Sequence, residues 1–298
     1  MTAPLRRART SVLEIAYEEN GPADGVPVFL MHGFPDDART WDDVAAPLAA
    51  KGYRVIVPYL RGYGPTRFLA PATMRSGQQG AIGSDLKELM DALGIERAFL
   101  GGYDWGGRAA CIVAALWPER VRGLVSITGY NIQNIAGNLK PDPADHEWRY
   151  WYQWYFNTPR GVAGLAANRH DICRLLWKMW SPNWSFDDAT YEATGAAFEN
   201  PDFVDIVIHS YRHRFQNAQS DPAYEAIERR LALQPKITVP TVVLHGAADG
   251  VDLPELSECA AAHFTASYRR EVVPNAGHFF SREAPEKVVD AVLELARD

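Results

Sequence analysis

Gly102-Tyr103-Asp104-Trp105-Gly106 is the stretch of sequence that decides the fold. Residues 97–102 are apolar enough for a buried strand, and residues 105–117 have the composition of a helix. Asp104 therefore falls on a strand-to-helix turn, where flanking glycines let the backbone turn sharply. This is the pattern of a nucleophile elbow, with aspartate where such elbows commonly carry serine. An ordinary turn is the alternative, because glycine-flanked aspartates are common in turns.

Strand-like and helix-like segments alternate on both sides of this turn. We expect strands at residues 28–31, 53–57, 98–101, 124–127, 240–245 and 268–273, and helices at 41–50, 84–93, 105–117, 254–263 and 285–296. Strand after helix after strand is typical of a mostly parallel sheet flanked by helices. The sequence therefore predicts one α/β core, formed by residues 1–130 and 235–298.

Between residues 131 and 234 the strand signals give way to aromatic-rich helical segments. Six tryptophans fall in this part of the chain: Trp148, Trp151, Trp154, Trp177, Trp180 and Trp184. An insertion after the strand at 124–127 would leave the sheet on the same edge as Asp104 and cover it as a lid. We therefore predict a helical cap over residues 131–234, and its aromatic content favours a bulky or aromatic substrate.

Composition excludes several classes of protein. The chain has 298 residues, 47% of them hydrophobic, and a net charge of -7 without a Lys/Arg block, so we expect no nucleic-acid partner. No apolar run has signal-peptide or membrane-span character. Cys111, Cys173 and Cys259 are scattered and lack metal spacing, so we expect buried thiols in a reducing cytoplasm. We predict a cytoplasmic protein without a membrane partner, and leave a homodimer open.

A carboxylate nucleophile forms an ester with its substrate, and a base must then activate water to hydrolyse that ester. His278 is the best candidate among the eight histidines, because it follows the strand at 268–273 and so lies on the same edge as Asp104. A histidine base needs an acidic partner that fixes its tautomer. Asp249 follows the preceding strand and suits this role, with Asp252 as its rival. The order nucleophile, acid, histidine is that of the α/β-hydrolase triad.

Hydrolysis of the ester also needs donors for the oxyanion that forms when water attacks. One is expected to be the backbone amide of Trp105, directly after the nucleophile. The other is assigned to the amide of Phe34, in the loop that follows the strand at 28–31.

Three motifs, together with Asp249 and His278, carry a family resemblance: His32-Gly33-Phe34-Pro35, Arg61-Gly62-Tyr63-Gly64 and Asp104-Trp105-Gly106-Gly107. The chain resembles the α/β-hydrolase superfamily over nearly its whole length, in the aspartate-nucleophile branch of epoxide hydrolases and dehalogenases. The resemblance to epoxide hydrolases implies a small-molecule epoxide opened to a vicinal diol, with an aspartyl ester intermediate, His-activated water and no cofactor or metal.

In epoxide hydrolases, two lid tyrosines hydrogen-bond the epoxide oxygen. The first often lies in a Tyr-Gln-x-Tyr-Phe stretch followed closely by proline, which is similar to residues 152–159 and implies Tyr152. The second typically precedes an arginine, which implies Tyr211. Phenols near pKa 10 can donate hydrogen bonds while neutral. Tyr150 and Tyr155 are local alternatives to Tyr152, and the apolar helical stripe around Tyr211 would also suit a core residue.

Dehalogenases are the alternative within the same branch. Haloalkane dehalogenases hold halide with a tryptophan after the nucleophile, as Trp105 would here. Fluoroacetate dehalogenases clamp the substrate carboxylate with two arginines, of which this chain has only Arg108, and use a His-Trp pair where it has Tyr152-Gln153. Residues expected to contact the substrate are Phe34, Trp105, Arg108, Trp151 and Trp154.

The sequence leaves two further possibilities, a receptor and a metal site. A hydrolase fold can also serve as a ligand-binding receptor, since fold alone does not fix function. His209 and His213 have the spacing of two metal ligands on a helix, but no third ligand is evident, so we expect a solvated helix face and no metal. The chain has no G-x-G-x-x-G motif and no P-loop for a nucleotide cofactor.

Overall fold

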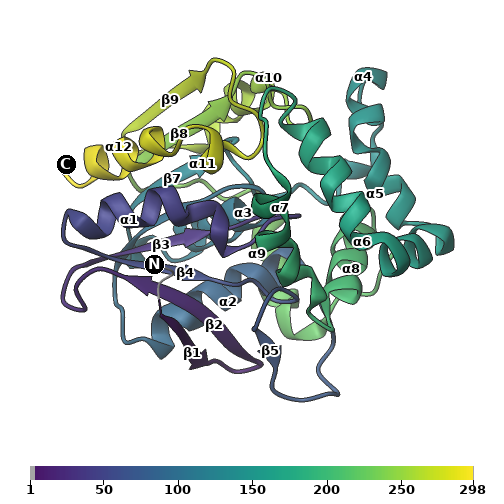
Figure 1. Ribbon diagram of the computed structural model, residues 1–298, viewed down its shortest axis with the longest axis horizontal. Helices are drawn as coiled ribbons and strands as arrows, with labels where there is room; N and C mark the ends of the chain where they lie inside the picture. Colours follow the sequence, from purple (N-terminus) through teal and green to yellow (C-terminus); the bar gives the residue numbers. More distant parts are fainter. Residues whose placement is uncertain (1–3, 298) are drawn as a thin grey trace.

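The computed structural model describes residues 4–297, and within them nine strands form one mixed sheet (Figure 1). Their spatial order is β1-β2-β4-β3-β6-β7-β8-β9, with β5 beside β2. The strands are β1 (Leu5–Arg9), β2 (Leu13–Asn20), β3 (Val26–Met31), β4 (Tyr53–Pro58), β5 (Arg67–Phe68), β6 (Ala98–Gly102), β7 (Val121–Ile127), β8 (Thr241–Gly246) and β9 (Tyr268–Val273). In that spatial order, the six neighbouring strands β4, β3, β6, β7, β8 and β9 pair in parallel. The predicted mostly parallel α/β sheet is confirmed.

Three strands were not expected from the sequence. β1, β2 and β5 pair antiparallel at the end of the sheet near the amino terminus. In β1 only Ala8 is buried, and three of its five residues are arginines. Charged side chains on an edge strand discourage pairing with another chain, but they also hide the alternation that predicts a strand.

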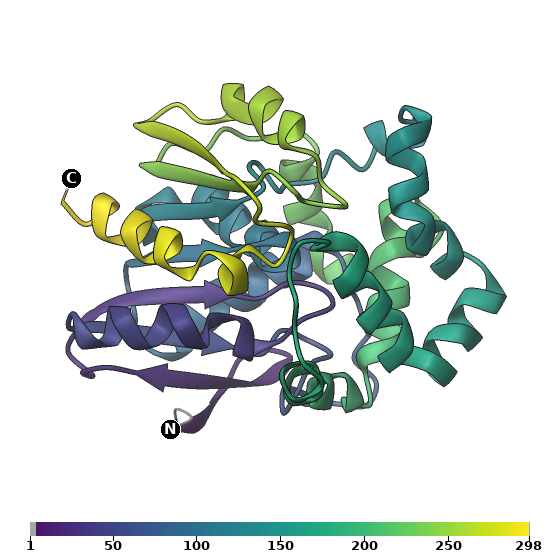
Figure 2. The ribbon, with the colours of Figure 1, turned by 45° about the horizontal axis from the view of Figure 1, so that its top comes forward.

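Helices cover both faces of the sheet. α1 (Asp42–Ala50) packs beside α12 (Pro285–Leu295) on one face, and α2 (Gln79–Ala92) packs against α3 (Asp104–Leu116) on the other (Figure 2). α2 begins at residue 79 instead of the expected 84. It contains Gly83, where a Cβ would come within 2.4 Å of the Ile112 side chain in α3. This glycine lowers the helix signal but permits close packing of the two helices.

Six helices lie between β7 and β8. They are α4 (Ala144–Glu147), α5 (Trp151–Phe156), α6 (Pro159–Trp180), α7 (Asp188–Gly195), α8 (Phe203–Arg214) and α9 (Glu225–Leu231). Figures 1 and 2 show α4 to α8 gathered at one end of the sheet, whereas α9 packs on α2 in the core. The division at residues 131 and 234 therefore stays a prediction.

Two expectations at the end of the chain need correction. The helix expected at 254–263 is α10 (Pro254–Cys259) followed by a 3-10 turn over Ala260–His263. Cys111 and Cys173 are buried as predicted, but Cys259 is exposed because it ends this short helix at the surface.

Among residues 4–297, no helix combines the length and the apolar character needed to cross a membrane.

Candidate active site

Asp104 is the first residue of α3, separated from the end of β6 by one residue, and its backbone φ is 49°. Such a positive φ is uncommon outside glycine and marks a position held by its surroundings. A Cβ on Gly102 would lie 2.6 Å from the Gly106 carbonyl group, and one on Gly106 would lie 2.1 Å from the Met31 oxygen. The strand, the turn and the helix approach so closely that both glycines are needed to present Asp104 at the sheet edge.

The loop after β3 reaches the Asp104 carboxylate. The Phe34 amide donates a hydrogen bond of 2.7 Å to Oδ1 of Asp104. A Cβ on Gly33 would come within 2.6 Å of the Asp104 Cβ, so glycine is required for this approach. The Trp105 amide belongs to the first turn of α3, where N–H groups have no intrahelical acceptor. The two amides assigned to an oxyanion site therefore belong to the loop and the helix turn that adjoin Asp104.

His278 follows β9 and pairs with Asp249, which follows β8. Nδ1 of His278 lies 2.9 Å from Oδ2 of Asp249. Oδ1 of Asp249 accepts hydrogen bonds of 2.9 Å from the amides of Val251 and Asp252. The rival carboxylate, Asp252, instead accepts a hydrogen bond of 3.3 Å from the Tyr150 hydroxyl. This arrangement fixes the imidazole and leaves its Nε2 buried without a partner among the described residues.

The charges around His278 decide its protonation. Burial alone would lower the pKa of His278, but the charges of Asp249, Asp252 and Asp104 and the hydrogen bond that the ring donates to Asp249 together raise it to about 9. The ring is therefore an imidazolium at neutral pH while Asp104 is charged. Loss of the Asp104 charge would remove one of the causes of the raised pKa, so the ring would release its proton more readily.

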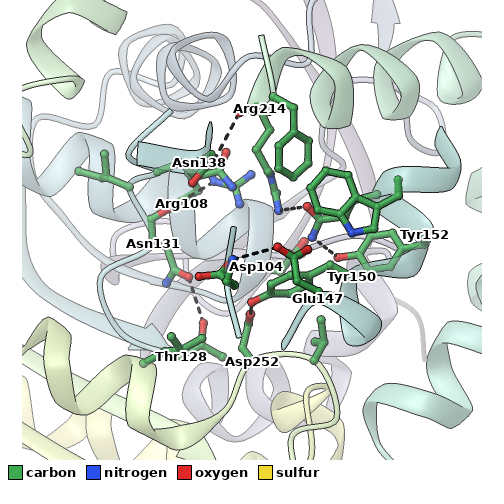
Figure 3. A pocket seen from close by; sticks show the side chains of 18 of the residues that line it. Asp104, Arg108, Thr128, Asn131, Asn138, Glu147, Tyr150, Tyr152, Arg214 and Asp252 are labelled. Atoms are coloured by element: carbon green, nitrogen blue, oxygen red, sulfur yellow. Dashed lines mark hydrogen bonds between the residues drawn. The ribbon is translucent and has the colours of Figure 1, made fainter. Parts of the chain in front are cut away.

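A cavity of about 680 Å³ joins the sheet edge to the helical insertion (Figure 3). Its volume is typical of a small-molecule site. Of the residues expected in the site, it is lined by Asp104, His278, Arg108, Tyr152 and Trp154.

Tyr152 and Tyr211 lie next to each other, with ring centroids 5.2 Å apart. The Tyr152 hydroxyl accepts a hydrogen bond of 2.9 Å from the Gln153 amide, which leaves its own proton free to donate. The Tyr211 hydroxyl is buried and has no partner among the described residues. Burial raises the pKa of both phenols, and the Asp104 charge adds to this, so both remain neutral.

Several expected contact residues do not line the cavity. Phe34 and Trp105 are fully buried and stack at 5.7 Å, and Tyr211 is fully buried beside Tyr152. Trp151 packs on Tyr152 and Tyr155 instead of reaching the cavity, because neighbouring residues on a helix point in different directions. The expectation that Trp151 contacts the substrate is therefore not supported by its position.

Sequence reasoning missed two contributors to the site. Arg214, the last residue of α8, lines the cavity, and its spacing of three from Tyr211 on one helix was a usable signal. The Trp180 carbonyl accepts hydrogen bonds from the amides of Gly250 (2.9 Å) and His278 (3.1 Å). The end of α6 thus holds the two loops that carry the Asp249–His278 pair.

The expected solvated face at His209 and His213 is wrong. His213 is buried and His209 half-buried, because the loop after α8 folds over them. His209 Nε2 lies 2.9 Å from the Gln219 carbonyl, and His213 Nε2 lies 3.0 Å from the Ser220 hydroxyl. Within residues 4–297, no group of three His, Cys, Asp or Glu side chains is placed to hold a metal.

The sequence profile of the alpha/beta hydrolase fold family matches residues 26–285, and the chain belongs to that family. It is 37% identical to an epoxide hydrolase from Caballeronia sordidicola over 314 residues, covering 96% of this chain and 90% of the relative. Epoxide hydrolase A from Mycobacterium tuberculosis is 26% identical over 324 residues, and the match covers 99% of this chain and 98% of the relative.

A crystal structure of a Klebsiella pneumoniae protein, proposed to be an epoxide hydrolase, superposes with a TM-score of 0.97 at 47% identity and covers 99% of this chain and 97% of that one. Together with the named relatives, it identifies the chain as an enzyme of the epoxide hydrolase type. The family resemblance drawn from the sequence is confirmed.

Proposed function

We propose that the enzyme opens an epoxide to a vicinal diol through a covalent ester on Asp104. The observation that carries this proposal is the position of Asp104, which lines the same cavity as His278 and has one carboxylate oxygen held by the Phe34 amide. The second oxygen of Asp104 is then free to attack, and the epoxide hydrolase relatives supply the substrate class.

In the first step, Oδ2 of Asp104 attacks one ring carbon of the epoxide, and the bond from that carbon to the ring oxygen breaks. The electron pair passes to the oxygen, which becomes an alkoxide and is a poor leaving group without an acid. Tyr152 and Tyr211 donate hydrogen bonds to this oxygen, and one of them transfers its proton to complete the hydroxyl. Once Asp104 has lost its charge, the imidazolium of His278 releases its proton to solvent, and the tyrosinate takes up a proton in its place. The product is an ester between Asp104 and the substrate.

In the second step, His278 takes a proton from water, and the resulting hydroxide attacks the carboxyl carbon of Asp104. The oxyanion that forms is stabilised by the amides of Phe34 and Trp105. Its collapse breaks the bond between that carbon and Oδ2, which leaves as the second hydroxyl of the diol with a proton from His278. Asp104 is left as a carboxylic acid with one oxygen atom from water, and transfer of its proton to His278 restores the resting charges. Asp249 stabilises the imidazolium.

Arg108 in the cavity is the observation that favours the alternative, a dehalogenase acting on haloacids. The two functions differ in their products. The purified enzyme should be incubated with styrene oxide, phenylglycidate, chloroacetate and 1-chlorobutane, with Asp104→Ala as the control without a nucleophile. We expect diol from an epoxide and no halide. Halide release without diol would replace the proposal with the dehalogenase, and binding without any product would favour the receptor.

A further inference from the structure

Two arginines reach into the same side of the cavity (Figure 3). Arg108 lies one helical turn after Asp104 in α3 and is only 5% exposed. Arg214 is half-buried at the end of α8, in the helical insertion. Both side chains therefore carry charge into an enclosed space beside the nucleophile.

The protein partners of these two guanidinium groups are all neutral. Arg108 donates from Nε to the Asn131 carbonyl at 3.3 Å, and Arg214 donates from Nη1 to the Gln153 side chain at 3.1 Å. With its amide oxygen turned toward the donors, Gln133 accepts from Nε (2.7 Å) and Nη2 (2.9 Å) of Arg214 and from Nη2 of Arg108 (3.2 Å). One amide oxygen thus brings the two cations together.

Neither guanidinium has a carboxylate oxygen within 4.0 Å among the described residues. Two other arginines with little exposure are paired: the buried Arg61 contacts Asp85 at 2.6 Å, and the half-buried Arg282 contacts Asp36 at 2.5 Å. Burial of a charge without a counter-ion is costly, and two adjacent like charges increase that cost.

This cost of burying a charge lowers the pKa of Arg108, which burial and the neighbouring Arg214 charge bring to about 10. It still carries its charge at neutral pH. A guanidinium has five N–H donors, and the protein bonds above use only two of those of Arg108 and three of those of Arg214. The remaining donors are available to a ligand in the cavity that both side chains line.

We propose that Arg108 and Arg214 form a carboxylate-binding subsite, so that the preferred substrates are epoxides bearing a carboxylate close to the ring. This rests on the proposed function. Residues four apart on a helix have Cβ atoms about 5–6 Å apart. A substrate carboxylate bound by Arg108 would therefore be only a few bonds away from the ring carbon that Asp104 attacks. The arginines also offset the repulsion between the substrate carboxylate and the charged nucleophile.

The rest of the cavity limits the ligand to one negative charge. Asp142, Glu147 and Asp252 also line it, and none of them pairs with either guanidinium within 4.0 Å. Asp252 accepts a hydrogen bond from the Tyr150 hydroxyl, and Glu147 accepts one from the Asp142 amide. These carboxylates would repel a second anionic group. Tyr150 and Trp154 on the same walls suit an apolar or aromatic remainder.

The first test compares 3-phenylglycidate with 3-phenylglycidamide, which has nearly the same shape without the charge. We expect kcat/KM of the wild type to favour the acid by about 10-fold or more, the scale of a charge-assisted bidentate contact. Arg108→Gln and Arg214→Gln should each lower kcat/KM for the acid about 10-fold or more beyond any loss that they cause for the amide. Arg212→Gln, on α8 but outside the cavity, is the matched control.

A second measurement needs no turnover. Calorimetry on Asp104→Asn should show 3-phenylpropanoate binding at least about 10-fold more tightly than 3-phenylpropanamide, and Arg214→Gln added to this variant should remove the difference. Tight binding of the acid by an enzyme that opens no epoxide would keep the subsite and reject the proposed function. Equal binding of acid and amide, or equal kcat/KM for the two glycidates, would overturn the subsite. Chloroacetate turnover would assign the same subsite to a haloacid.

Discussion

At the residue scale, His278 and Asp104 have different tasks because their surroundings differ. Both line the cavity, but Oδ1 of Asp104 accepts from the Phe34 amide, whereas His278 is fixed by Asp249. Attack on the epoxide needs only the carboxylate, and hydrolysis of the ester needs the base. We therefore expect His278→Gln to form the ester and fail to hydrolyse it. Intact-protein mass spectrometry after substrate addition should show one substrate mass added to most of the protein, and an unmodified variant would contradict the assigned role.

The pKa of His278 couples the two steps. It is about 9 in the free enzyme, partly because Asp104 is charged. The ester is uncharged, so the pKa should fall once it has formed, and the neutral base should appear at lower pH. We expect Asp104→Asn, which mimics this neutral state, to titrate His278 below the wild-type value in an NMR experiment. The rate of ester hydrolysis should rise with pH and level off above the lowered pKa. An unchanged pKa in the variant would disprove the coupling.

The lid tyrosines decide whether the chemistry suits an epoxide. Tyr152 lines the cavity and Tyr211 has an unpartnered buried hydroxyl beside it. Replacing either with phenylalanine should slow ester formation by roughly 10- to 1000-fold, the scale of a hydrogen bond to a developing alkoxide. Stopped-flow measurement of the first step would test this, with Tyr155→Phe as the control. Full epoxide activity in a variant that carries both Tyr152→Phe and Tyr211→Phe would exclude their role as donors to the epoxide oxygen.

The sequence predicted some of these residues better than others, for a physical reason. Asp104, Asp249 and His278 each follow a strand of a parallel sheet, and the carboxyl ends of such strands meet at one edge, so sequence position implies spatial position. Arg214 and Trp151 lie on helices of the insertion. There the direction of a side chain depends on how the helices pack, and sequence spacing alone could not assign one to the cavity and the other away from it.

At the element scale, the end of α6 connects the helical insertion to the His278 loop. The Ser181 hydroxyl accepts from the Phe279 amide at 3.0 Å and donates to Glu283 at 2.5 Å, while Glu283 also accepts from the Gly277 amide. A Cβ on Gly277 would meet Ser181 at 2.6 Å, so the loop and the helix end are in close contact.

We expect Ser181→Ala to destabilise the protein by about 1–3 kcal/mol, because it leaves the Phe279 amide and the Glu283 carboxylate without a partner. It should also slow ester hydrolysis more than ester formation, since only the former needs His278. Asp187→Ala, which removes the N-cap of α7, should lower the free energy of unfolding without this kinetic selectivity. Denaturant unfolding would measure the loss of stability, and single-turnover kinetics would measure the rates of ester formation and ester hydrolysis. Equal slowing of these two rates would argue against a role of Ser181 in positioning His278.

Strands and helices could be predicted from the sequence where they contain a clear run of apolar residues. β6 and β8 are buried at every position, and their apolar runs are evident in the sequence. β1 was missed because arginines occupy most of its exposed positions, and the start of α2 was missed because Gly80 and Gly83 reduce helix propensity. In both cases, packing of the finished sheet outweighs the local signal.

At the scale of the whole molecule, the core supplies Asp104, Asp249 and His278, and the insertion supplies Tyr152, Tyr211 and Arg214. We propose that α4 to α8 act as the cap, which holds the substrate over the sheet edge and excludes water that would compete with the tyrosines. The cavity between the two parts is lined by both, so neither would form the site alone.

The central claim is a covalent ester on Asp104, and isotope labelling in a single turnover tests it most directly. With enzyme in excess over an epoxide in water enriched in oxygen-18, hydrolysis at the carboxyl carbon should leave one labelled oxygen on the protein and none in the first diol released. Peptide mass spectrometry should locate the label at Asp104. Label in the first diol and none in the protein would mean that water attacks the epoxide directly, and would contradict the account.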